Sequence, residues 1–279
     1  MRVGEKTHHL LSDYLKLLKQ RPLSEGDIQI LKDAVAQEMK TEFQLSKERD
    51  YTSYDRDQRF GLSEHYYGEN PAKDGAGIDD KLDEVIGKVH HNLDVFVASD
   101  WNEKVQHYFK TAKTVFVESP RQKDFESMKL KLGSIPALKN INIMASPDFG
   151  VIFDEKKYLI IDWKSGQEKM DDGVSDQLKI YALKLLLKWD IDIENVEMSG
   201  YEVYLPSLKQ IGGKIEKSDI DDIIAKLQED VEFQKQFLID GDVVRNEPIA
   251  HTSFTRTKSE KKCASCTFRK VCGDLKEIE

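Results

Sequence analysis

Two acidic residues and a lysine stand at a spacing that could support metal-dependent hydrolysis. The pair Pro147-Asp148 is followed, after thirteen residues, by Asp162-Trp163-Lys164. Because side chains alternate along a strand, Asp162 and Lys164 project from the same face of the strand predicted over 158–164. A turn between the two segments would fold the strand that contains Asp148 back as a hairpin. The sequence therefore predicts two carboxylates that converge beside one lysine.

This set of side chains suits a hard divalent cation. Such ions take oxygen ligands, and Mg²⁺ typically uses one or two protein carboxylates together with water and phosphate oxygens. The ion can activate water and neutralise the charge that develops on phosphorus during displacement. A lysine nearby could position or polarise that water. Taken alone, a three-residue segment of this kind is more often an exposed acid-base pair at a strand end than a metal site.

Three further features accompany this segment. Gln177 and Tyr181 are four residues apart in a predicted helix and share one helical face. Gly87-x-x-His90 lies in an earlier predicted helix, with His90 at the edge of its apolar stripe. The C-terminal region carries a cysteine cluster with the spacing C-x2-C-x5-C: Cys263, Cys266 and Cys272. The combination is more specific than any one of its parts.

The elements that must position these residues follow from hydrophobic periodicity. Apolar residues recur at three- and four-residue steps over 78–99, which predicts a helix with one buried stripe. Alternating segments rich in Val, Ile, Phe and Tyr then predict strands, and two further helices follow. The predicted strands are 114–118, 141–154, 158–163 and 196–205, and the later helices are 174–189 and 218–238. This order predicts an α/β or α+β core with a mixed sheet flanked by helices.

The chain divides into three regions by composition. Residues 1–77 predict two helices over 7–48, broken near Pro22 and Gly26, followed by a loop-rich segment. Residues 78–242 contain the predicted core. Residues 243–279 form a basic C-terminal cap, in which 245–272 carry seven basic residues against two acidic ones.

Together, the motifs resemble those of the PD-(D/E)XK nuclease superfamily. The matching motifs are Pro147-Asp148, the segment Asp162-Trp163-Lys164-Ser165-Gly166 and Gln177-x-x-x-Tyr181, in this order. They are most similar to the RecB-like branch, which includes CRISPR-associated RecB-like exonucleases, the nuclease domains of RecB and AddB, and eukaryotic exonuclease V. Gly87-x-x-His90 is similar to the G-x-x-H helix of that branch. The resemblance covers about residues 50–272.

The resemblance implies a restriction-endonuclease-like core and a role for each motif residue. Metal ligands for Mg²⁺ or Mn²⁺ would be His90, Asp148, Asp162 and the backbone carbonyl of Trp163. Lys164 would be catalytic together with the two aspartates, while Gln177 and Tyr181 would contact DNA or orient the site. Glu118, at the end of the first strand, could add a carboxylate or be a solvated strand end.

The cysteine cluster resembles the last three ligands of the [4Fe–4S] cluster in many RecB-like nucleases, but this sequence has no fourth cysteine. Three interpretations stay open. An iron-sulfur cluster could be bound with a non-cysteine fourth ligand, for which His65 and His251 are candidates. A Cys₃His zinc site is also chemically reasonable. Alternatively, the three cysteines pack as small hydrophobic side chains.

Composition limits the class of protein. The chain has 279 residues, a net charge of −9 and 39% hydrophobic residues, which is ordinary for a globular protein and argues against a nucleic-acid coat protein. Three cysteines do not indicate a secreted disulfide framework. Without an apolar N-terminal run or a membrane-length segment, we expect a cytoplasmic protein with no membrane association. No Gly-Lys-Ser/Thr triplet occurs, so an ATP-driven helicase partner would be a separate chain.

These patterns predict a divalent-metal-dependent DNA nuclease, and an exonuclease on single-stranded or frayed DNA ends in particular. Hydrolysis would proceed by in-line attack of water on the phosphodiester. Two alternatives remain: a non-catalytic DNA-end or partner-binding module of the same fold, and a restriction-type endonuclease. The Gln177-x-x-x-Tyr181 helix and the cysteines favour the exonuclease.

Overall fold

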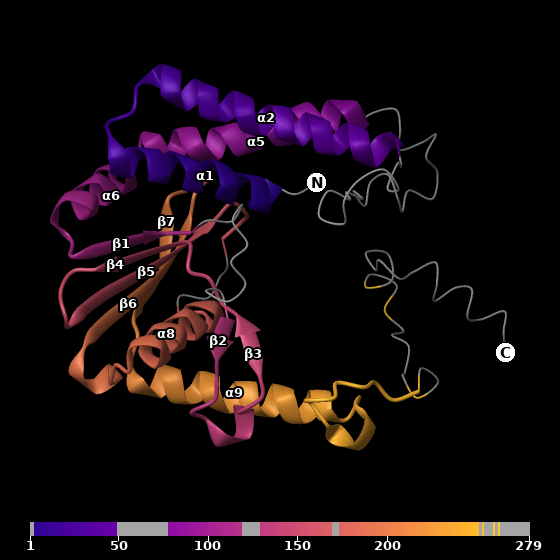
Figure 1. Cartoon of the computed structure of the whole chain (residues 1–279). Coiled ribbons are helices and arrows are strands. Elements are labelled where there is room, and N and C mark those ends of the chain that lie inside the picture. The colour runs from indigo at the N-terminus through magenta and orange to yellow at the C-terminus, as the bar shows by residue number, and fades with distance from the viewer. Residues whose placement is uncertain are drawn as a thin grey trace. The chain divides into compact units, whose positions relative to one another are not determined.

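A computed structural model describes residues 3–48, 78–118, 129–168 and 173–250, together with Ser253, Ser259 and Lys262 (Figure 1). The chain divides into two compact units. One unit contains residues 2–40 and 83–232, and with them the whole central sheet. The other contains the remaining described residues, among them the short 3-10 helix η4 (Ile239–Gly241) and the bridge between Leu238 and Pro248.

The central sheet has five strands in the order β1-β4-β5-β6-β7. Their bounds are Thr114–Val117 (β1), Phe149–Ile152 (β4), Lys157–Lys164 (β5), Glu197–Tyr204 (β6) and Lys209–Lys214 (β7). Only the β5-β6 pair is parallel; the other neighbours are antiparallel. The sheet is therefore mixed, as predicted, and β4 folds back against β5 so that Phe149 pairs with Ile161.

The strand predicted over 141–154 is in fact two strands in two sheets. Its first part is β3 (Asn142–Met144), which pairs with β2 (Lys129–Lys131) in a separate two-stranded sheet. Its second part is β4, and residues 145–148 connect them. Pro147 in this connection lacks the N–H that a strand ladder needs, which accounts for the break, and the pairing partners, which are distant in sequence, place the two parts in different sheets. The 3-10 helix η2 (Pro136–Leu138) lies between β2 and β3.

Helices flank the central sheet on both sides (Figure 1). On one side are α1 (Val3–Gln20), α5 (Ile78–Val97) and α6 (Asp100–Thr111), and α2 (Glu25–Glu48) follows α1 along the chain. On the other side are α8 (Asp176–Trp189) and α9 (Lys217–Lys235), with the 3-10 helix η3 (Ile193–Asn195) between α8 and β6. This arrangement is the restriction-endonuclease-like α/β fold that the sequence predicts.

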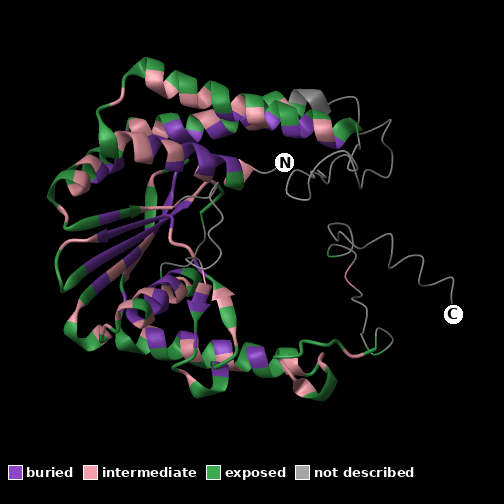
Figure 2. Ribbon diagram, in the orientation of Figure 1, coloured by how far each residue is buried: buried purple, intermediate pink, exposed green. Residues whose placement is uncertain are grey.

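The core on the α5 side is aromatic and fixes the face of β5 that points away from the predicted site. The predicted stripe of α5 is buried at Val89, Leu93 and Phe96 (Figure 2). The Phe96 ring packs edge-on against Trp163 of β5, with ring centroids 5.3 Å apart. Because neighbouring side chains of a strand alternate, this packing directs Asp162 and Lys164 to the opposite face, toward α8.

Helix α1 packs directly on the sheet-bearing unit. Its Leu10 and Leu11 are almost fully buried, and the Tyr14 hydroxyl lies 3.0 Å from Oδ1 of Asn102 on α6. Polar contacts join it to the end of β1: Ser12 Oγ donates to the Glu118 carbonyl at 2.5 Å. The N-terminal helix, which composition grouped with residues 1–77, therefore packs against the sheet and holds the end of β1.

Gly212 of β7 is a position that only glycine fits. Its φ is +125°, and a Cβ there would lie 2.3 Å from the Gly200 carbonyl oxygen. We expect Gly212→Ala to lower the free energy of unfolding by about 2 kcal/mol or more. The matched control is Gly213→Ala, where a Cβ meets nothing within 4 Å and the change should stay within about 0.5 kcal/mol. Urea denaturation measures both, and equal stabilities would contradict this explanation.

Candidate functional site

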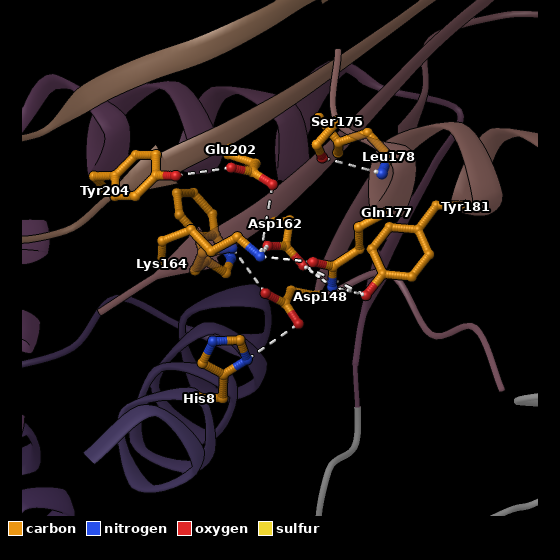
Figure 3. A network of polar contacts seen from close by, with 11 residues as sticks. His8, Asp148, Asp162, Lys164, Ser175, Gln177, Leu178, Tyr181, Glu202 and Tyr204 are labelled. Carbon is orange, nitrogen blue, oxygen red and sulfur yellow. Dashed lines mark hydrogen bonds and ion pairs between the residues drawn. The ribbon is translucent and has the colours of Figure 1, made fainter. Parts of the chain in front are cut away.

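Polar side chains from four segments meet where β5 ends and β4 begins, at one end of the central sheet's strands (Figure 3). Asp162 and Lys164 lie at the end of β5, and Asp148 is the residue directly before β4. Helix α8 contributes residues from its first turns, and α1 contributes His8. Asp148 is 7% exposed and Asp162 only 1%, so both carboxylates are removed from bulk water.

Asp148 joins β5 to α1. Its Oδ2 accepts a hydrogen bond of 2.7 Å from the backbone N–H of Trp163, and its Oδ1 lies 3.2 Å from Nδ1 of His8. The backbone carbonyl of Asp148 accepts from the N–H of Glu118 at 2.9 Å. These contacts hold Asp148 beside Asp162, so the predicted convergence of the two carboxylates is present in the structure.

Lys164 lies within a set of acceptors. Its Nζ forms an ion pair with Oδ2 of Asp162 and donates to Oε1 of Gln177 at 2.7 Å. A second carboxylate, Oε1 of Glu202 on β6, lies 3.7 Å from the same nitrogen. The ammonium is therefore held at the carboxylates and not extended into solvent, which is the placement the sequence predicts for it.

The two α8 residues orient Asp162. Ser175 accepts from the Leu178 N–H at the start of α8, which places Gln177 in the first turn. Gln177 Nε2 donates to Oδ1 of Asp162 at 3.0 Å and to the Tyr181 hydroxyl at 2.6 Å. That hydroxyl is 3.4 Å from the same Asp162 oxygen, and burial raises the pKa of Tyr181, which keeps it a donor. These contacts support the orienting role among the two roles expected for this pair.

Three side chains could bind one metal ion. Ligand atoms of His8, Glu118 and Asp148 all lie within 4.8 Å of one another. Carboxylate oxygens with one imidazole suit Mg²⁺ or Mn²⁺. Asp162 adds a further buried carboxylate next to Asp148. The donor set therefore fits a divalent cation, whose charge would offset the crowded carboxylates.

His90, the histidine expected among the metal ligands, does not join this group. Its Nε2 lies 3.0 Å from the backbone carbonyl of Lys32 on α2, because its position on α5 directs it toward that helix and not toward the sheet. The structure brings His8 to the carboxylates instead. The sequence analysis did not indicate His8, because its place in the site depends on how α1 packs against the end of β1.

The crowding of acids and bases shifts their pKa values. Burial, and then the neighbouring Asp148, raise the pKa of Glu118 to about 7. Burial, and then the charge of Asp148, raise the pKa of Asp162 to about 6. Burial alone would lower the pKa of His8, but the carboxylates of Asp148, Asp162 and Glu118 outweigh it and raise that pKa to about 9. In the metal-free protein all three groups hold protons more tightly than in an unfolded chain.

We therefore expect the metal-free protein to lose stability as the pH rises from about 5 to about 9. Asp162 and Glu118 cause this loss of stability between their unfolded pKa values of about 4 and their folded pKa values of about 6 and 7. His8 contributes from its unfolded value to about 9. Melting temperatures measured with a chelator at fixed ionic strength check this, and Glu118→Gln should flatten the curve between pH 5 and 7. A melting temperature that rises over this range would contradict the expectation.

Several predictions lie outside the described residues. These are the cysteine cluster, Cys263, Cys266 and Cys272, and the candidate fourth ligands His65 and His251. The [4Fe–4S] and zinc interpretations therefore stay predictions. Among the helices of the described residues, none is long and apolar enough to span a membrane.

Comparison with known proteins gives one result. A family model described as the PD-(D/E)XK nuclease superfamily matches residues 2–273, which is almost the whole chain. The matched range includes α1 with His8 as well as the strands and helix that carry the other site residues. No curated protein and no solved structure matches the chain.

Proposed function

The chain belongs to the PD-(D/E)XK nuclease superfamily, and from this membership we propose that it is a DNA exonuclease that acts on single-stranded or frayed ends. The family establishes the coarser activity, a nuclease that depends on divalent metal. The choice of an exonuclease is supported by the Gln177-x-x-x-Tyr181 helix, which is similar to that of RecB-like exonucleases. A helicase or another nucleic-acid-processing protein as partner belongs to the same proposal.

The observation that carries the proposal is the placement of Lys164. Its ammonium lies against the buried Asp162, and Asp162 lies next to Asp148, whose other oxygen faces His8. A phosphodiester that approached this edge would meet a cation and a group of metal-binding acids together. That combination favours hydrolysis over DNA binding alone.

We assign the metal ligands as His8, Asp148 and Asp162, with Glu118 and the carbonyl of Trp163 as further donors. A divalent cation bound there would supply a Lewis acid that lowers the pKa of water and offsets charge on the phosphate. For the cysteine cluster we retain the proposal of a [4Fe–4S] or zinc site.

The chain's own residues then have distinct tasks. Lys164 places a positive charge and rotatable donors where the attacking water and the phosphate oxygens meet. Gln177 bonds to both Lys164 and Asp162, so it holds the acid and the amine in one geometry. Tyr181 supports the same Asp162 oxygen from the next helical turn. A site whose side chains are held in place by hydrogen bonds loses little energy to reorganisation during reaction.

The test uses labelled DNA with free or blocked ends, single- and double-stranded, with Mn²⁺ and with chelator. The proposal predicts Mn²⁺-dependent release of nucleotides from free single-stranded ends. A ladder of discrete fragments from circular DNA would identify an endonuclease instead. Metal-independent DNA binding without cleavage of any substrate would identify a non-catalytic module and overturn the proposal.

A further inference from the structure

Glu202 is a buried carboxylate that the proposed chemistry does not yet use. It is 2% exposed and pairs with Asp162 in the parallel register of β5 and β6. Tyr204, two residues on, pairs with Lys164 in the same register. The four side chains therefore form two adjacent rows on one face of the sheet, toward α8 (Figure 3).

We propose that Glu202 is a positioning residue that holds Lys164 in its active orientation; this rests on the proposed nuclease function. Two contacts carry the inference. Oε2 of Glu202 accepts a hydrogen bond of 2.8 Å from the Tyr204 hydroxyl, and Oε1 lies 3.7 Å from Nζ of Lys164. The buried Tyr204 fixes the carboxylate of Glu202, and the other oxygen of that carboxylate faces the Lys164 ammonium.

Burial explains why an acid at this position indicates a specific role. A carboxylate removed from water is costly unless a cation and hydrogen bonds compensate it, and an apolar side chain would serve a sheet interior without that cost. Lys164 is a cation that faces Glu202. The pair is therefore interpreted as an element of the site and not as ordinary core packing.

The second argument comes from the demands on Asp162. In the structure this carboxylate pairs with Lys164, yet it is also a proposed metal ligand. A carboxylate that binds a dication has less negative charge to share with an ammonium. Glu202 lies on the neighbouring strand, outside the group of ligand atoms formed by His8, Glu118 and Asp148. Its charge remains available to hold the flexible lysine stem.

The test is Glu202→Gln, which keeps the shape and the bond to Tyr204 but removes the charge. We expect kcat for DNA cleavage to fall about 100-fold, since small displacements of a catalytic group have effects of this size. The KM for DNA and the calorimetric affinity for Mn²⁺ should stay within about twofold of wild type. The matched control is Glu197→Gln on the same strand, an exposed residue that pairs with Lys157 and should leave kcat unchanged.

A readout independent of cleavage is the Lys164 ammonium signal in a ¹H–¹⁵N spectrum, assigned by its loss in Lys164→Arg. We expect the ammonium hydrogens to exchange slowly with water in wild type and rapidly in Glu202→Gln. Wild-type kcat and an unchanged signal in Glu202→Gln would overturn the inference.

If Glu202→Gln does not fold, Tyr204→Phe decides instead. It should lower kcat with KM unchanged, and a kcat equal to that of wild type would overturn the inference. A wild-type protein without any cleavage would refute the proposed function, which is a distinct outcome.

Discussion

Lys164→Ala is expected to reduce Mn²⁺-dependent DNA cleavage by about 10³-fold, the size of effect typical for a group that assists proton transfer or stabilises charge in the transition state. Lys164 is the cation that lies against Asp162 and Gln177. Single-turnover rates on a 5′-labelled single strand measure the loss. Calorimetry with Mn²⁺ should show that the metal affinity is retained, because an ammonium does not ligate metal.

A control for the lysine change lies on the same strand. Lys157, at the opposite end of β5, is half exposed and pairs with Glu197 at 3.1 Å. Lys157→Ala should leave the rate within about twofold of wild type, since exposed ion pairs contribute little. Asp162→Ala should reduce cleavage at least as strongly as Lys164→Ala. Cleavage at the wild-type rate by either site variant, with the fold intact, would refute the assignment of the site.

His8→Ala is expected to weaken Mn²⁺ binding by at least about tenfold and to lower cleavage accordingly. His8 is the imidazole beside Asp148, with 3.2 Å between Nδ1 and Oδ1. Removing it takes a nitrogen donor from the group formed with Glu118 and Asp148. Titration calorimetry at pH 8 measures the affinity, and the melting temperature confirms that α1 still packs.

His90→Ala is the matched comparison, because His90 is the histidine that the sequence motif indicated. Its ring lies against the carbonyl of Lys32 and contributes no ligand to the site as described. We expect Mn²⁺ affinity and cleavage to match those of wild type. The opposite result, with affinity lost in His90→Ala and retained in His8→Ala, would restore the assignment based on the motif.

Local sequence patterns predicted the parts of the site that depend on local geometry. Strand alternation placed Asp162 and Lys164 on one face, and Trp163 does pack on the other side against Phe96. Helical spacing placed Gln177 and Tyr181 on one face, and both reach Asp162. These results follow because a two-residue or four-residue period needs no knowledge of distant contacts.

The remaining parts depend on packing between segments far apart in sequence. His8 precedes Asp148 by 140 residues, and its position follows from how α1 packs against the end of β1. Glu202 appears as an ordinary acid in a strand until the parallel register places it beside Asp162. The separation of β3 from β4 likewise depends on their partners. No periodicity in one segment contains this information.

The central claim is that one divalent cation is bound at the edge of the sheet where His8, Asp148 and Asp162 meet. Anomalous diffraction from crystals soaked in Mn²⁺ tests it most directly. We predict a strong manganese peak within coordination distance of His8 and both aspartates. A peak at His90, or full Mn²⁺-dependent activity in crystals or solution with no manganese at these three residues, would contradict the claim.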